Sequence, residues 1–330
     1  MIERVRANHT VRGGMRDRAT AIDMRRGARA VCIVAILAIA FLFSGCASPR
    51  KMAINMVGNA LAGTGTAFAS DPDPELIREA VPFGLKLMEA LLAETPEHKG
   101  LLLAVTSGFT QYAYAFVQPE ADKLEDEDFD AAEAKRDRAK KLYLRARDYG
   151  LRRLELRHEG IREGLLKDPE GAVARVDKKD VPVLYWTSAS WGAAISLGLD
   201  DPELIADVPA MQALIDRALE LDEDYDAGAI HSFLIGYEMI RQGAEGKPED
   251  RARRHFARAV ELSGGSQAGA YVALAESVSV ETQNKKEFNE LLEKALAVDV
   301  DARPEWRLLN IVMQRRAQWL LGRSEDLFLE

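Results

Sequence analysis

The spacing of apolar residues predicts a helix in the first ordered stretch of the chain. Asp71-Pro72-Asp73-Pro74 has the acidic residues and prolines that suit a turn and the first turn of a helix. From Leu76 to Leu92 apolar residues then recur at intervals of three and four, and Pro96 closes the helix. Residues 99–117 are apolar on nearly every side, which indicates a helix buried on most sides and ended by Gln118-Pro119.

The rest of the chain follows the same pattern. A basic amphipathic helix is expected at 138–158, after a highly charged stretch at 120–137, and residues 165–180 are expected to form a connecting segment. Further helices are predicted at 183–198, 202–221, 226–242, 248–262, 268–281, 285–298 and 304–322. No alternation of apolar and polar residues of useful length predicts a strand. The pattern therefore predicts an all-α fold.

Similar helix endings suggest internal repeats. In four of them a large apolar residue stands three positions before an alanine: Ala146, Ala218, Ala259 and Ala295. The intervals are 72, 41 and 36 residues, against about 34 for one tetratricopeptide repeat and about 68 for two. We expect a helical bundle of antiparallel helix pairs with degenerate tetratricopeptide-like repeats. An ordinary amphipathic bundle with chance alanines stays open as the alternative.

The first 45 residues predict an export signal rather than part of the fold. Eight arginines precede an unbroken apolar run from Ala30 to Phe43, too short for a membrane span of about 20 residues. The run ends in Ser44-Gly45-Cys46, which resembles a bacterial lipobox, although a short transmembrane anchor, or a core cysteine after a buried helix, stays open. We expect a signal peptide at 1–45, with translation starting at Met1 or Met24, and lipidation at Cys46. Residues 46–70 would then form a lipid-anchored segment and 71–330 the helical domain.

Composition and charge narrow the classes of partner. Hydrophobic residues make up 47% and charged residues 29%, a globular profile. Residues 1–45 hold 8 basic and 3 acidic side chains, so the remaining chain has 36 basic and 50 acidic ones, net −14. Nucleic acid is not expected as a partner of such an acidic body. A membrane is expected as a partner, through the lipid anchor. Ala47 after the cysteine favours the outer membrane, with the protein facing the periplasm.

No motif in the chain predicts catalysis, a metal or a cofactor. The two cysteines rule out a disulfide scaffold, and no two of the five histidines stand at helical ligand spacing. The glycine-rich stretch at 58–65 lacks the lysine of a phosphate-binding loop. The acidic run at 125–128 lacks the spacing of a calcium loop.

Two short stretches carry a resemblance to a known family. They are GFTQYAYAFVQ at 108–118 and YWTSASWGAAI at 185–195, within four longer segments at 74–98, 108–122, 181–238 and 275–321. With the lipobox, they resemble the T-component lipoproteins of TRAP transporters. The resemblance implies a helical protein with cryptic tetratricopeptide-like repeats around a hydrophobic pore or cavity. It also implies a partner, the periplasmic solute-binding P-component, and no catalytic residue.

The same two stretches contain the candidate ligand-binding residues. Both predicted helices combine aromatic side chains with isolated polar ones, as in sites for small organic ligands. We expect them to line one cavity, with five side chains nearest its lumen: Gln111, Tyr112, Tyr114, Trp186 and Trp191. Core packing is the alternative for each of them.

The sequence therefore predicts a non-enzymatic accessory lipoprotein of a TRAP transport system, without a cofactor. It would bind a small apolar or amphipathic ligand and the P-component. Two alternatives stay open: a repeat-type scaffold lipoprotein of envelope assembly without a ligand, and an envelope hydrolase such as a lytic transglycosylase. The sequence does not determine the oligomeric state, and a homo-oligomer stays open.

Overall fold

The structure is a computed structural model that describes residues 49–63 and 65–329. The predicted signal peptide, Met24 and Cys46 lie outside the described residues. The chain divides into a unit that ends at Ala53 and a unit from Ile54 to Glu330. Apart from the first residues of helix α2, everything that follows concerns the second unit.

The described residues form helices and contain no strand, so the predicted all-α fold is confirmed. The α-helices of the first half are α2 (Pro49–Ala62), α3 (Gly65–Ala69), α4 (Pro74–Glu94), α5 (Lys99–Tyr112), α6 (Gln118–Leu124), α7 (Phe129–Glu155), α8 (Ile161–Lys167), α9 (Pro169–Val173) and α10 (Val181–Ser196). Those of the second half are α11 (Pro202–Ala206), α12 (Val208–Leu221), α13 (Ala229–Ile240), α14 (Pro248–Ser263), α15 (Ala268–Leu274), α16 (Lys285–Leu296), α17 (Arg307–Gly322) and α18 (Ser324–Leu327).

Short side chains at the helix starts explain several of these boundaries. The Asp73 carboxylate accepts hydrogen bonds from the backbone N–H groups of Glu75 and Leu76, at 3.0 and 3.1 Å, and so caps α4. Asp128 caps α7 in the same way, at 3.0 Å from the N–H of Ala131. The charged stretch at 120–137, which the sequence left unassigned, is therefore mostly helical: it holds most of α6 and the first turns of α7, joined by a turn at 125–128.

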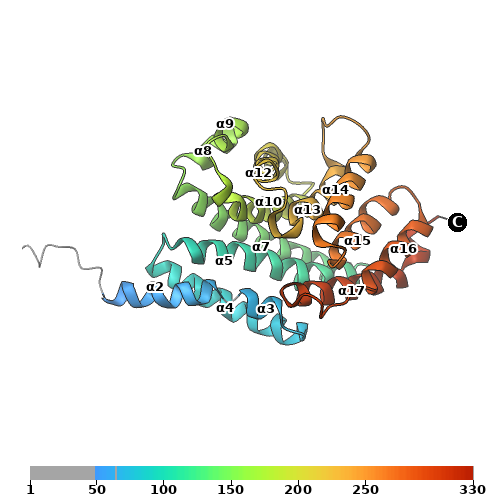
Figure 1. Ribbon diagram of the computed structural model, residues 1–330, viewed down its shortest axis with the longest axis horizontal. Coiled ribbons are helices and arrows are strands. Elements are labelled where there is room, and N and C mark those ends of the chain that lie inside the picture. Colours follow the sequence, from blue (N-terminus) through green and yellow to red (C-terminus); the bar gives the residue numbers. More distant parts are fainter. Residues whose placement is uncertain (1–48, 64, 330) are drawn as a thin grey trace, which may run out of the picture. The chain divides into compact units, whose positions relative to one another are not determined.

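The helices α5, α7 and α10 form the centre of the first half. Figure 1 shows them side by side, and each packs against the other two, with α4 packed on α5. Gly150 of α7 lies where the three meet, because a Cβ atom there would come within 3.1 Å of Thr106 on α5 and within 2.1 Å of Thr187 on α10. One stretch, Lys99–Leu124, is long and apolar enough to cross a membrane by length and composition alone. The core helix of a soluble protein passes the same test, and this one packs between neighbouring helices.

Consecutive helices also pack against each other in the second half. The main contacts join α13 to α14, α15 to α16 and α16 to α17. The four alanines of the proposed repeats are buried at such contacts, at 0 or 1% exposure: Ala146, Ala218, Ala259 and Ala295. Their burial agrees with close helix approach, while the tetratricopeptide-like repeat itself stays a prediction.

The sequence was wrong about where the apolar helix at 99–117 ends. The backbone stays helical past Gln118-Pro119 to Leu124, through a π-helical turn, η1 (Ala113–Val117). The N–H of Gln118 reaches the carbonyl of Ala113, five residues back, and Pro119 has no N–H to place in the helix. A second π-helical turn, η4 (Ala275–Ser279), continues α15. Short 3₁₀ turns complete the fold: η2 (Lys178–Asp180), η3 (Tyr225–Ala227) and η5 (Pro304–Trp306).

Candidate functional site

A pocket of about 400 Å³ lies between the two π-helical turns. Its walls come from five parts of the chain: the start of α4, η1, α6, η4 and α17. The apolar wall consists of Ala115, Phe116, Val312, Met313 and Trp319. The polar lining consists of Glu75, Arg78, Tyr114, Gln118, Glu120, Asp122, Lys123, Glu276, Ser277, Arg315 and Arg316, and Pro119 completes it. We call this cavity the η1–η4 pocket.

Both π-helical turns present side chains to this pocket. A π-helical turn inserts an extra residue into a helix and is often found at functional sites. Here η1 supplies Tyr114, Ala115 and Phe116, and η4 supplies Glu276 and Ser277. The local change of helix geometry therefore occurs twice, in helices distant in sequence, and both times at this cavity.

A guanidinium held between two carboxylates forms the polar end of the pocket. Two nitrogens of Arg316, Nε and Nη2, donate to Oε1 of Glu276, at 2.9 and 2.7 Å. Its Nη1 forms an ion pair with Oδ2 of Asp122 at 2.8 Å. The guanidinium also lies over the Trp319 ring, 4.3 Å from the ring centroid. The Arg316 side chain is only 19% exposed, so it is fixed in position by its partners.

Burial changes the acidity of two groups in the pocket. Burial raises the pKa of Glu276 above its usual value, and Arg316 opposes that rise. Tyr114 as a whole is 47% exposed, but loss of water around its hydroxyl, followed by the nearby Glu276 carboxylate, raises the pKa of the phenol to about 12. The Tyr114 phenol therefore stays protonated at neutral pH and keeps a hydrogen to donate. The hydroxyl lies 3.8 Å from Sδ of Met313, a weak acceptor.

Exposed charges ring the mouth of the pocket. Arg78 pairs with Glu120 at 3.0 Å, and Arg315 pairs with Glu75 at 2.7 Å. The mouth therefore joins α4 to α6 and α17 through ion pairs that water can reach. Such pairs contribute little to stability, about 0–1 kcal/mol each, so they open readily to another partner.

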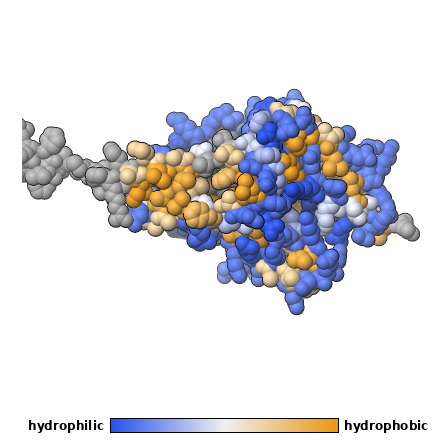
Figure 2. Space-filling model, turned by 90° about the horizontal axis from the view of Figure 1, so that it is seen from below, coloured by the Kyte–Doolittle hydropathy of each residue, from blue (hydrophilic) through white to orange (hydrophobic). Residues whose placement is uncertain are grey.

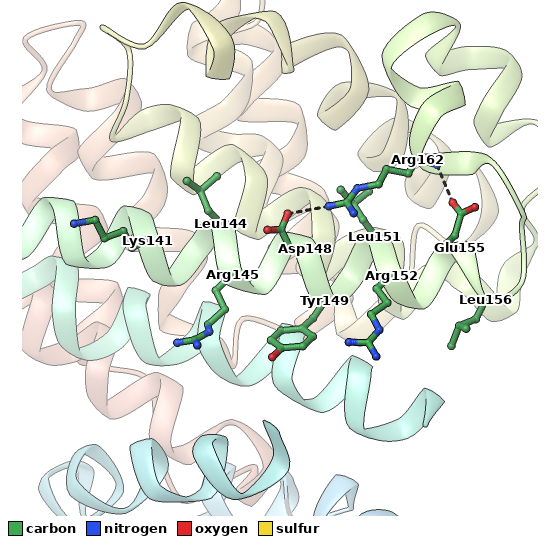
Figure 3. A pocket seen from close by; sticks show the side chains of 10 residues that line it. All are labelled: Lys141, Leu144, Arg145, Asp148, Tyr149, Leu151, Arg152, Glu155, Leu156 and Arg162. Carbon is green, nitrogen blue, oxygen red and sulfur yellow. Dashed lines mark hydrogen bonds and ion pairs between the residues drawn. The ribbon is translucent and has the colours of Figure 1, made fainter. Parts of the chain in front are cut away.

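A second hollow, of about 700 Å³, is a weaker candidate (Figure 3). Every lining residue falls within 141–162, along α7 and the start of α8. Figure 3 shows both Asp148 and Glu155 paired with Arg162. The guanidinium of Arg162 donates to Asp148 at 3.3 Å, and its backbone N–H donates to Glu155 at 3.1 Å. The remaining cations, such as Lys141 and Arg152, extend from one helix face rather than enclosing a volume. We therefore take the η1–η4 pocket as the candidate site.

The structure does not bring the five predicted ligand residues together at either pocket. Tyr114 lines the η1–η4 pocket. Tyr112 does not, although its ring packs against that of the lining residue Phe116, with centroids 5.8 Å apart and planes tilted by 50°. The side chain of Gln111 is exposed. Trp186 packs edge-on against Tyr185 at 4.9 Å.

Trp191 lies deep in the core around α10, only 2% exposed. Its indole N–H donates to Oδ2 of Asp207 at 3.1 Å, and the guanidinium of Arg147 lies 5.2 Å from its ring centroid. Its environment is that of a packed core residue, because its polar atom already has a partner within the protein. Among the five residues, only Tyr114 reaches the candidate site directly.

Sequence reasoning missed Glu276, Arg316 and Trp319 as members of one site. They lie on η4 and α17, and no motif links them to Tyr114. One weak signal was present: Gln118-Pro119 interrupts an apolar helix, and a proline inside a helix requires a local distortion. The sequence also gave no sign that His231 and His255 meet, with their Nδ1 atoms 2.8 Å apart, because they lie on different helices.

Within the residues that the structure describes, no group of three or more histidine, cysteine, aspartate or glutamate side chains is arranged to hold a metal ion. Seven carboxylate and guanidinium groups of the η1–η4 pocket are paired with one another: Arg316 with Glu276 and Asp122, Arg78 with Glu120, and Arg315 with Glu75. Their arrangement suits hydrogen bonding to an organic ligand whose apolar part contacts Phe116, Met313 and Trp319.

Comparison with known proteins gives two findings. The family model described as TAtT, TRAP transporter T-component, matches residues 70–328. A protein of Treponema pallidum (strain Nichols), named only as an uncharacterized protein, is 31% identical over 267 residues. That alignment covers 80% of this chain and 83% of the relative.

Proposed function

Because the chain belongs to the family of TRAP transporter T-components, an accessory role in a TRAP transport system follows, and we propose that it performs this role by holding a small amphipathic ligand in the η1–η4 pocket. The family match, from residue 70 to residue 328, covers all but the last two residues of the helical domain predicted at 71–330. It therefore includes every element that builds the pocket.

The observation that carries this proposal is the composition of the pocket. One side is apolar and aromatic, with Phe116, Met313 and Trp319. The opposite end offers a protonated phenol and the pair of Arg316 with Glu276. Apolar walls with a few placed polar groups are typical of sites for small organic molecules. The volume of about 400 Å³ suits a molecule of metabolite size.

The partner in this proposal is the solute-binding P-component of the transporter. The rim of the pocket consists of exposed ion pairs such as Arg78 with Glu120, which a docking protein can replace with pairs of its own. A protein that exchanges a ligand must dissociate quickly, so we expect an interface below about 1,200 Å². The anchor predicted at Cys46 would hold the protein on the periplasmic face of the outer membrane.

The test fills the pocket with a bulky side chain. Ala115 lines it, and Ala115→Trp occupies much of its volume without removing a charge. Ala104→Trp is the matched control, because Ala104 is also partly buried in the same apolar helical stretch but lines neither pocket. The full chain is purified from its own host in detergent, and native mass spectrometry after detergent removal detects any small molecule that stays bound.

We expect a bound small molecule in the wild type and in Ala104→Trp, and its loss in Ala115→Trp. Circular dichroism checks that both variants keep their helix content. Equal retention of the molecule by the two variants would contradict the placement of the ligand. A wild type that binds neither a small molecule nor the P-component would favour the scaffold alternative.

A further inference from the structure

The polar end of the η1–η4 pocket holds one guanidinium against two carboxylates. Nε and Nη2 of Arg316 lie 2.9 and 2.7 Å from Oε1 of Glu276, and Nη1 lies 2.8 Å from Oδ2 of Asp122. Nη1 is also shielded from water. Each nitrogen of this guanidinium therefore already faces a carboxylate oxygen of the protein, and none is without an anionic partner that a ligand could replace at no cost.

The charges at this end do not balance. Glu276 and Asp122 bring two negative charges to the single positive charge of Arg316. Burial raises the pKa of Glu276, and the negative charge of Asp122 adds to that rise. An anionic ligand would therefore meet a surplus of negative charge in a place where water screens it poorly.

The other cations of the lining stand at the exposed mouth. Arg78 and Arg315 pair there with Glu120 and Glu75, and Lys123 is exposed. Figure 2 looks onto the side of the molecule that carries α4 and shows hydrophilic residues over much of it. Water and salt screen exposed charges, with a screening length of about 8 Å at physiological ionic strength. The mouth cations therefore do little to offset the surplus at the buried end.

Two groups at the buried end are open to a ligand. Oε2 of Glu276 takes no part in the pairing with Arg316, so it can accept a hydrogen bond. The hydroxyl of Tyr114 stays protonated at neutral pH and contacts only a weak acceptor within the described residues, Sδ of Met313 at 3.8 Å. It can donate to a better acceptor. A ligand group that matches both must accept one hydrogen bond and donate another.

We propose that the η1–η4 pocket takes an amphipathic ligand with an uncharged polar end that both donates and accepts a hydrogen bond, such as a hydroxyl or a primary amide, and that Glu276 and Asp122 exclude carboxylates. This inference rests on the proposed function, because it names the class of ligand for the same pocket. A ligand hydroxyl accepts from Tyr114 and donates to Glu276. A ligand carboxylate can only accept, and it would have to displace one of the two acids from Arg316.

The test compares two probes that share an eight-carbon chain and differ at the polar end, octan-1-ol and octanoate. Each is titrated calorimetrically into the full chain in dodecyl maltoside at about pH 8, where octanoate is ionised. Ala115→Trp, whose pocket is filled, supplies the heat of partitioning into micelles, which is subtracted. We expect octan-1-ol to bind the wild type at least about tenfold more tightly than octanoate does.

A charge-removing variant then tests the part of the acids. Glu276→Gln keeps the size of the side chain, and octanoate should bind it at least about tenfold more tightly than it binds the wild type, because a ligand carboxylate can pair with Arg316 in place of the lost one. Glu287→Gln is the matched control. Glu287 also holds an arginine, Arg253, through two nitrogens, but it lines neither pocket.

Circular dichroism checks the fold of each variant. Asp122→Asn removes the other acid and should also strengthen octanoate binding, so it replaces Glu276→Gln if that variant does not fold. Octanoate that binds the wild type as tightly as octan-1-ol would overturn the inference and leave the proposed function standing. Equal octanoate affinity in Glu276→Gln and Glu287→Gln would also overturn it. If neither probe gave more heat than in Ala115→Trp, the proposed function would fail together with the inference.

Discussion

The glycine at the crossing of three helices allows a sharp test of the packing. Gly150 of α7 faces α5 and α10, and an added Cβ would lie 2.1 Å from Oγ1 of Thr187. The same atom would lie 3.1 Å from Cγ2 of Thr106. Thr187 cannot turn away without cost, because its hydroxyl donates to the carbonyl of Val183 at 2.5 Å and the side chain is fully buried. We therefore expect Gly150→Ala to force the helices apart.

The expected size follows from two opposing effects. Alanine in place of glycine inside a helix stabilises by about 1 kcal/mol. Overpacking a well-filled core costs about 1–3 kcal/mol, and a contact of 2.1 Å belongs at the upper end of that range. The net effect of Gly150→Ala should be a loss of about 1–2 kcal/mol in the free energy of unfolding. Gly236 of α13 is the control, because its added Cβ would have no neighbour within 4 Å.

The assay is urea unfolding of the full chain, followed by its helical circular dichroism. Gly236→Ala should stabilise the protein by about 0.5–1 kcal/mol, while Gly150→Ala destabilises it. Thr187→Ala combined with Gly150→Ala should recover part of the loss, since it removes the nearest atom, and a double-mutant cycle measures this coupling. If Gly150→Ala stabilised the protein as much as Gly236→Ala, the three-helix crossing would be wrong.

Three further predictions concern other parts of the chain. Ala259→Leu should cost about 1–3 kcal/mol of unfolding free energy, because the backbone at Ala259 lies close to Gly228: a Cβ added at Gly228 would be 3.1 Å from the Ala259 Cα. An unchanged urea midpoint would contradict this packing. Burial lowers the pKa of His255 to about 4 and also lowers the pKa of His231, so the fold favours their neutral forms. Below about pH 6.5 the unfolded chain therefore binds more protons than the folded one, and the unfolding free energy should fall by about 1–3 kcal/mol between about pH 6.5 and 4. The fall should be smaller in His255→Gln. The same pH slope in the wild type and in His255→Gln would refute this. Cys46→Ser should abolish palmitate labelling and membrane association, and a label retained in the variant would disprove lipidation at that residue.

The helices were predictable because their signals are local. The spacing of apolar residues predicted α4 and α10, and the Asp73-Pro74 turn marked where α4 begins, as its capping hydrogen bonds confirm. The connecting segment expected at 165–180 instead contains the end of α8, all of α9 and η2, each too short for a periodic pattern to show. The end expected at Gln118-Pro119 was wrong because a π-helical turn absorbs the proline, and no periodicity in the sequence marks such a turn.

The candidate site was less predictable because it depends on contacts between distant segments. Tyr114 was identified from its place in an aromatic helix, but Arg316 lies about 200 residues further along the chain, on α17. Trp191 had the same sequence features as Tyr114, and the difference arises only in the fold, where Asp207 binds its indole N–H. An aromatic side chain in an apolar helix does not reveal whether it faces a cavity or the core, because both environments are apolar.

The central claim is that the η1–η4 pocket exchanges a ligand with the P-component, and a transfer measurement tests it most directly. The cognate P-component is loaded with an isotopically labelled solute and mixed with the full chain, and native mass spectrometry then follows the label. We predict that the label moves to the wild-type chain and to Ala104→Trp but not to Ala115→Trp. Label that never leaves the P-component, or that reaches Ala115→Trp as fully as the wild type, would contradict the claim.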